Sequence, residues 1–245
     1  MSKKLLIIKT GTTIPPLLEQ SEDFEKWFFS GCEMVADEFM VSSIYLDEPL
    51  PTLSSVSGII ITGSAAYVTD LEAWNYVAVD YLRLAQKRGV PILGVCYGHQ
   101  LLAWTFGGVV EFHKQGREIG TVDIINSAAA REDALFAGLP PRFKAQVSHL
   151  QTVTALPPEA VRLASNSFDE NHAFRLGERI WSVQFHPEFS AAAVSEYIRF
   201  RADAIAAEGM AVAELLERVT STPDAVSILP RFVRLCAELE SGVSS

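Results

Sequence analysis

Cys96 is the residue of this chain best suited to nucleophilic chemistry. The segment 91–104 reads Pro-Ile-Leu-Gly-Val-Cys-Tyr-Gly-His-Gln-Leu-Leu-Ala-Trp, so the cysteine follows a short apolar run and precedes an apolar helical stretch, with Gly94 and Gly98 two residues to either side. This pattern is typical of a nucleophile elbow, a sharp strand-to-helix turn whose flanking glycines let neighbouring backbone approach. The partial positive charge at a helix N-terminus lowers the pKa of a thiol there. We therefore expect a nucleophile at the carboxyl end of a buried strand, where open α/β sheets place their sites.

An unreactive buried cysteine is the alternative for Cys96, because free cysteine is among the most buried residue types. That alternative does not account for the two glycines or for the change from a strand pattern to a helix pattern at this residue. The sequence therefore favours the nucleophile.

A thiol nucleophile needs a base, and the base needs a group that orients it. The segment 181–188 reads Trp-Ser-Val-Gln-Phe-His-Pro-Glu, a half-buried strand pattern that ends at His186. Glu188 follows two residues later, and Pro187 fixes the backbone between them. A carboxylate this close can hold one imidazole nitrogen and leave the other for the thiol. The His-Pro-Glu segment alone also fits an ordinary surface turn. Together with the elbow cysteine upstream, it indicates a catalytic base and its orienting carboxylate.

Short apolar runs supply the strands that would position these groups, at residues 5–8, 59–61 and 92–95. Uniformly apolar runs rich in β-branched residues predict strands covered on both faces, as in a parallel sheet. Apolar residues at three- and four-residue steps predict a helix over residues 71–85, and we expect a further strand at residues 41–46. This alternation of strands and helices predicts a doubly wound α/β fold.

The pattern changes after Gly107-Gly108 to short β-like pieces separated by turn residues. From Ser190 it becomes helical, with a last helix expected over residues 224–240. Because no linker is long enough to separate two domains, we expect a single domain.

Composition and charge exclude several classes of protein. The chain has 245 residues, 49% of them hydrophobic, and a formal net charge of −10, which argues against nucleic acid as a partner. No apolar stretch reaches the roughly 18–20 residues of a membrane-spanning helix, and the run after Lys3-Lys4 is too short for a signal peptide. Three widely spaced cysteines, without a ligand-like Cys or His pattern, predict reduced thiols, no metal site and a cytoplasmic protein.

The two motifs together, Gly-Val-Cys-Tyr-Gly-His-Gln and, about 90 residues later, Gln-Phe-His-Pro-Glu, resemble the class I glutamine amidotransferases. The pattern is similar to a stand-alone group that looks like the amidotransferase domain of GMP synthase. The resemblance implies a mostly parallel, open, flavodoxin-like sheet. It implies an amidotransferase-like domain over residues 1–205 and a helical extension at residues 206–245 that packs on the same domain.

The resemblance also implies a mechanism. Cys96 would attack the γ-carboxamide of glutamine, with His186 as the general base and then the proton donor to departing ammonia. Glu188 would orient His186, and water would hydrolyse the γ-glutamyl thioester to glutamate.

An oxyanion hole is implied at the backbone N–H of Tyr97 and in the loop that holds Gly63 and Ser64. Most relatives carry two glycines in this loop, where the present chain has Gly63-Ser64. A backbone donor survives that change if Ser64 adopts the required conformation.

Substrate binding is implied at Gln100 and at the loop Ser148-His149-Leu150, which in relatives contact the amino-acid part of the substrate. Leu150 departs from the pattern of many relatives, which have Gly or another residue followed by Asp. That departure leaves the substrate open but not the nucleophile.

The leading function is therefore hydrolysis of free glutamine by a glutaminase component, whose partner would be an ammonia-accepting synthase subunit. A free-standing γ-glutamyl peptidase or hydrolase uses the same thioester chemistry and stays open, and a catalytically idle binding or scaffold protein is the third alternative. We expect no nucleotide cofactor, because phosphate-loop and dinucleotide-binding fingerprints are absent, and no membrane partner. His99 is expected to pack or to cap a helix, and His113 and His172 to lie on the surface or at strand ends.

Overall fold

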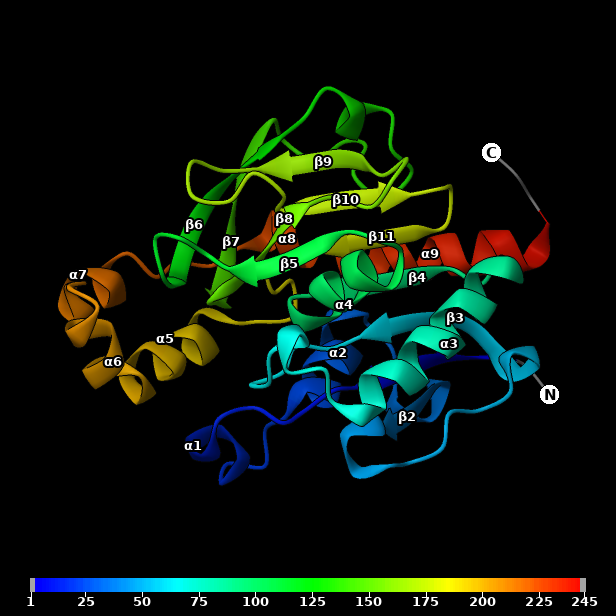
Figure 1. The fold of residues 1–245 in the computed structure, drawn as a ribbon, viewed down its shortest axis with the longest axis horizontal. Helices are drawn as coiled ribbons and strands as arrows, with labels where there is room; N and C mark the ends of the chain where they lie inside the picture. Colours follow the sequence, from blue (N-terminus) through cyan, green and yellow to red (C-terminus); the bar gives the residue numbers. More distant parts are fainter. Residues whose placement is uncertain (1–2, 243–245) are drawn as a thin grey trace.

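A nine-stranded mixed sheet forms the centre of the molecule (Figure 1), in a computed structural model that describes residues 3–242. Its strands, in spatial order, are β2 (Phe39–Ser43), β1 (Lys4–Lys9), β3 (Val56–Ile61), β4 (Ile92–Val95), β11 (Ile180–Val183), β10 (Ala173–Leu176), β9 (Val161–Ser165), β6 (Glu118–Asn126) and β7 (Arg142–His149). A separate antiparallel pair joins β5 (Val109–Phe112) to β8 (Gln151–Ala155). The last three residues of the predicted C-terminal extension lie outside the described residues.

Five neighbouring strands, from β2 to β11, run parallel, and the strands from β10 to β7 pair antiparallel. The uniformly apolar runs lie in the parallel half, where residues 5–8 are all buried. This arrangement confirms the predicted doubly wound α/β fold, and the antiparallel half corresponds to the short β-like pieces read after Gly107-Gly108.

Helices cover both faces of the parallel half. Figure 1 shows α3 (Ala73–Lys87) and α4 (Tyr97–Thr105) over one face, with α2 (Phe24–Gly31) and α9 (Ile228–Ser241) over the other. The side chains of β1 alternate between the two layers, because successive residues of a strand point to opposite faces: Leu5 and Ile7 join one buried cluster, and Leu6 and Ile8 the other. The remaining helices are α1 (Pro15–Leu18), α5 (Ala191–Phe200), α6 (Ala202–Ala207), α7 (Val212–Glu217) and α8 (Pro223–Val226), and 3₁₀ turns include η2 (Ile44–Leu46) and η4 (Val68–Asp70).

Two predicted elements differ from the structure. The strand expected over residues 41–46 is β2 followed by the 3₁₀ turn η2, because Asp47 adopts a left-handed backbone (φ 59°) and the Glu48 carboxylate accepts a hydrogen bond from the Ser43 N–H at 2.7 Å. The last helix is broken into α8 and α9. Pro230 explains the break, since a proline without an N–H is tolerated only in the first turn of a helix that restarts before it.

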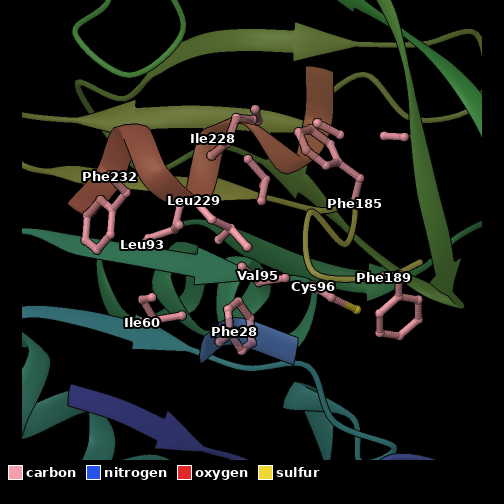
Figure 2. Packing of buried hydrophobic residues seen from close by; sticks show 14 of the residues in the cluster. Phe28, Ile60, Leu93, Val95, Cys96, Phe185, Phe189, Ile228, Leu229 and Phe232 are labelled. Atoms are coloured by element: carbon pink, nitrogen blue, oxygen red, sulfur yellow. The ribbon is translucent and has the colours of Figure 1, made fainter. Parts of the chain in front are cut away.

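The C-terminal helices complete the core beneath the site. Ile228, Leu229 and Phe232 of α9 are fully buried and pack with Leu93 and Trp181 of the central strands, as Figure 2 shows in close-up for the labelled members. None of the helices in residues 3–242 is both long enough and apolar enough to cross a membrane.

Candidate active site

Cys96 lies at the sharp turn between β4 and α4. Its φ of 52° and ψ of −100° are unusual for a residue with a side chain, and such strain concentrates at functional sites. Its N–H donates to the carbonyl of Val183 in β11 at 2.9 Å, which holds the turn against the neighbouring strand. Figure 2 shows the cysteine beyond Val95 at the end of β4, with its sulfur directed toward Phe189.

The two glycines around Cys96 are required by close packing of backbone on backbone. A Cβ added to Gly94 would lie 2.5 Å from the carbonyl oxygen of Gly98, and one added to Gly98 would lie 2.6 Å from the carbonyl oxygen of Ile61. Real Cβ atoms essentially never approach so closely. The glycines therefore let α4 start directly against β3 and β4, as the elbow pattern requires.

His186 and Glu188 reach the same point from the end of β11. His186 bridges to Gln146 of β7 through a backbone hydrogen bond of 2.8 Å, and its ring stacks on Phe189 with centroids 3.9 Å apart. Its Nδ1 donates to Oε1 of Glu188 at 2.7 Å. The opposite nitrogen, Nε2, is thereby left for the thiol.

Gly63 lies beside both His186 and Cys96. A Cβ built on Gly63 would be 2.9 Å from Cε1 of His186 and 3.8 Å from Cβ of Cys96. Any side chain at position 63 would therefore displace the His186 ring, so only glycine fits beside these two groups.

The electrostatics favour a thiolate beside an imidazolium. Burial alone would raise the pKa of the Cys96 thiol, but the charge of His186 and its interaction with the sulfur outweigh burial and lower the pKa. Burial alone would lower the pKa of His186, but Glu188 and the Cys96 thiolate raise it to about 10. The two groups thus stabilise one another in their charged forms, thiolate and imidazolium.

The predicted oxyanion-hole residues surround this pair. Tyr97 is the first residue of α4, so its backbone N–H has no acceptor within the helix. Ser64 holds its loop through its hydroxyl, which donates to the Thr10 carbonyl at 2.7 Å and accepts from the Ala66 N–H at 3.1 Å.

A hollow beside Cys96 collects the predicted substrate-binding residues. It has a volume of about 50 Å³, and Gln100, Ser148, His149 and Leu150 all line it. Gln100 donates its amide to the Gln151 carbonyl at 2.8 Å and to Oε1 of Gln184 at 3.0 Å, so its own carbonyl oxygen is the group left for a ligand. A second hollow of about 330 Å³ shares Cys96 and Ser148 with the first and is lined also by His186.

Two arginines at this site were not predicted from the sequence. Arg117 and Arg201 both line the hollow beside Cys96, and Arg201 lines the second hollow as well. Neither belongs to a recognisable motif, and only the fold brings them to the cysteine. The lining of the two hollows includes no Asp or Glu side chain.

His172, expected at the surface or at a strand end, lies at a strand end, directly before the first residue of β10. His172 is fully buried, and its Nε2 lies 3.0 Å from Oε2 of Glu118, to which His149 Nε2 also approaches at 2.9 Å. The fold thus brings together, within 4.8 Å, three side chains of metal-ligating type that the sequence spacing did not reveal.

A proton on His149 accounts for the two contacts of that residue in this cluster, whereas Nδ1 of His172 is buried without a hydrogen-bond partner. Nδ1 of His149 faces the Gln151 carbonyl at 3.0 Å and must donate to it, so Nε2 can donate to Glu118 only as an imidazolium. Burial lowers the pKa of His149, but Glu118 raises it overall, and the hydrogen bonds from the histidines draw the pKa of Glu118 well below its usual range despite burial. A divalent ion would replace the proton of His149 here.

The other titratable groups of the elbow region are not aimed at the nucleophile. His99 hydrogen-bonds through Nδ1 to Ser182 at 2.8 Å, and burial lowers its pKa to about 3, so it stays neutral. His113 is half-buried and stacks on Phe168 with centroids 3.9 Å apart.

Comparison with known proteins places this fold and site in a class. Two crystal structures of glutamine amidotransferases share the fold: one from Thermotoga maritima (TM-score 0.73, 21% identity, 100% of both chains) and one from Methylobacillus flagellatus (TM-score 0.75, 22% identity, 100% of this chain and 96% of the other). The family model described as glutamine amidotransferase class-I matches residues 33–202. The chain belongs to the class-I glutamine amidotransferase family.

Curated relatives point in the same direction. One subunit of a glutamine-hydrolysing GMP synthase from Methanococcoides burtonii is 35% identical over 157 residues, which cover 64% of this chain and 73% of that protein. A glutamine-hydrolysing GMP synthase from Porphyromonas gingivalis is 39% identical over 148 residues, which cover 59% of this chain but only 28% of that protein. The chain thus spans about a quarter of the longer relative.

Proposed function

We propose that this chain hydrolyses the γ-amide of glutamine to glutamate and ammonia through a γ-glutamyl thioester on Cys96. The observation that carries the proposal is the arrangement of His186 between Glu188, 2.7 Å from its Nδ1, and a strained elbow cysteine whose pKa it lowers. Family membership and the names of the curated relatives support glutamine as the substrate.

The reaction begins from the thiolate of Cys96. The sulfur attacks the amide carbon, and the negative charge that develops on the amide oxygen is stabilised by backbone N–H groups of Tyr97 and of the Gly63-Ser64 loop. His186 then gives its proton to the departing nitrogen, which leaves as ammonia. The neutral His186 next takes a proton from water, and the resulting hydroxide hydrolyses the thioester and regenerates the thiolate.

Glu188 holds His186 in the orientation that both half-reactions need. Its carboxylate is fully buried, and Pro187 fixes the backbone between the two side chains. The negative charge stabilises the imidazolium that donates to the leaving group.

We further propose that the ammonia passes to a synthase subunit. The Methanococcoides burtonii relative supports a partner of this kind, since its name describes one part of a larger GMP synthase. The three free cysteines in the described residues, all buried, support a reducing compartment and hence a cytoplasmic location.

Purified protein incubated with glutamine should release glutamate, and Cys96→Ala should lower this rate by at least about 10⁴-fold, because the thioester can no longer form. Cys32→Ala is the matched control and should retain activity, since Cys32 is a buried core thiol whose pKa burial raises to about 12.

Glutamate release should be measured by a coupled dehydrogenase assay, with γ-glutamyl peptides as parallel substrates. Turnover of the peptides alone, dependent on Cys96, would replace glutamine hydrolysis with the peptidase alternative. Equal rates for wild type and Cys96→Ala on both substrates would refute the thioester mechanism.

A further inference from the structure

Arg201 is an unpaired guanidinium in the wall of the active site. It lies at the break between α5 and α6, where its backbone (φ −101°, ψ 13°) ends one helix and starts the next. Its side chain lines both hollows that meet at Cys96. The guanidinium therefore reaches the site from the junction of two helices, not from the middle of either helix.

The hydrogen-bonding capacity of Arg201 is unused. Its Nε is buried without a hydrogen-bond partner, and among residues 3–242 no carboxylate forms an ion pair with its guanidinium. It lies over the aromatic ring of Tyr197, whose centroid is 5.8 Å from Cζ. A guanidinium held against a ring in this way keeps its planar donor edge for another ligand.

Arg117, the other arginine of the site, differs in this respect. Its Nε and guanidinium nitrogen donate to both carboxylate oxygens of Glu208 at 3.1 and 3.0 Å. Its charge is thereby neutralised by a bidentate pair. Arg201 is thus the cation beside Cys96 that lacks an anion.

An unpaired, partly buried cation is costly unless a ligand supplies the missing charge. Burial lowers the pKa of the Arg201 guanidinium, because the charged form loses part of its hydration. Neither hollow is lined by an Asp or Glu side chain, and the charge of a Cys96 thiolate is balanced by the imidazolium of His186.

The substrate has one permanent anion. Glutamine carries its α-carboxylate at the end opposite to the amide, the leaving group departs as neutral ammonia, and the oxyanion of the intermediate is transient and lies against the backbone N–H groups at Cys96. We infer that Arg201 binds the α-carboxylate of the substrate and so restricts the site to γ-glutamyl compounds with a free α-carboxylate. This inference rests on the proposed function for the identity of the substrate.

The first test measures turnover of glutamine. Because the α-carboxylate keeps the same charge in the ground state and in the transition state, Arg201→Met should raise KM by about 10- to 100-fold and leave kcat nearly unchanged. The KM of Arg201→Lys should lie between those of the wild type and Arg201→Met, since lysine keeps the charge without the planar donor pair. Arg199→Met is the matched control, because Arg199 is exposed and pairs with Glu196 at 2.5 Å, and its KM should equal that of the wild type.

The second test measures binding without turnover. In Cys96→Ala protein, calorimetry should show glutamine binding that weakens by about 10- to 100-fold when Arg201→Met is added. The analogue 4-aminobutanamide, which is glutamine without its α-carboxylate, should bind both proteins equally weakly.

The two tests separate the inference from the proposed function. Loss of kcat at unchanged KM in Arg201→Met, equal glutamine affinity with and without Arg201, or no glutamine binding to Cys96→Ala protein would each overturn the inference. Arg201-dependent binding of glutamine by a wild-type protein that does not hydrolyse it would instead overturn the proposed function and leave the inference standing.

Discussion

Each of the three cysteines is buried, yet their pKa values move in opposite directions. Burial raises the pKa of Cys32 to about 12 and also raises that of Cys236, because the thiolate loses its hydration without gaining a counter-charge. Cys96 loses its hydration too, but the imidazolium of His186 more than compensates for the loss. Cys96 therefore differs from the other two cysteines because His186 lies beside it, not because it is more exposed.

The pH dependence of kcat/KM should show the titration of His186. The pKa of His186 is raised to about 10, so kcat/KM should hold through neutral pH and fall as the imidazolium loses its proton in the alkaline range. Glu188→Gln removes the carboxylate that stabilises the imidazolium, so the alkaline limb should move to lower pH by about 1 to 3 units. The measurement is a kcat/KM profile for glutamine.

Glu196→Gln, a change at a carboxylate on α5 that pairs with Arg199, provides the control for this profile. An alkaline limb that stays in place in Glu188→Gln would show that Glu188 does not set the pKa of His186.

The sequence predicted the nucleophile, the histidine and its carboxylate because each lies in a short motif whose spacing already determines its geometry. Arg201 and His172 could not be predicted in that way. Arg201 reaches the site from a helix break far along the chain from Cys96, and His172 is buried by Glu118 and His149, which lie on other strands. Contacts between residues distant in sequence leave no local pattern to read.

At the scale of elements, the turn from β4 to α4 packs backbone closely against backbone. Gly94 and Gly98 bring α4 within direct backbone contact of β3 and β4, and the Gly98 N–H donates to the Thr62 carbonyl at 3.2 Å. The same contact sets the separation between the start of α4 and the Gly63-Ser64 loop, the two places that would supply the proposed oxyanion hole. The helix cannot shift without changing that separation.

Gly98→Ala should therefore impair catalysis by displacing the start of α4. The new Cβ would lie 2.6 Å from the Ile61 carbonyl oxygen and 2.7 Å from the Ile61 Cβ. A displacement on the order of 1 Å at an active site costs about 10²-fold in rate, and we expect a fall in kcat of this size. Steady-state kinetics on glutamine checks it.

Gly177→Ala separates this effect from a general loss of stability. Gly177 has a φ of 60° with nothing within 4 Å of an added Cβ, so its substitution strains the backbone away from the site and should leave kcat unchanged. Equal kcat for wild type and Gly98→Ala would show that the close packing of the elbow does not position the reacting groups.

For the molecule as a whole, the C-terminal helix is part of the core rather than an appendage. Phe232 of α9 is fully buried and packs edge-on against Trp181 of β11, with ring centroids 6.4 Å apart. Trp181 in turn lies on the strand that leads to His186. The helix therefore covers the face of the sheet directly beneath the strands that carry the site.

Phe232→Ala should lower the free energy of unfolding by about 3–5 kcal/mol, because it removes a buried ring and leaves a cavity between α9 and the sheet. Urea denaturation followed by circular dichroism measures the change. Arg234→Ala, at an exposed position of the same helix, should lie within about 0.5 kcal/mol of the wild type. A loss below about 1 kcal/mol for Phe232→Ala would mean that α9 contributes little to the cohesion of the core.

The pairing of β4 with β11 has a consequence for how the chain acquires its activity. The register joins Ile92 to Ile180 and Val95 to Val183, so the strand that ends in the thiol meets the strand that leads to the imidazole only after a long loop has closed. Parallel pairings of such high contact order form slowly. We therefore expect the Cys96 thiol to keep an ordinary pKa until these two strands have paired, because only their pairing brings the charge of His186 to the sulfur.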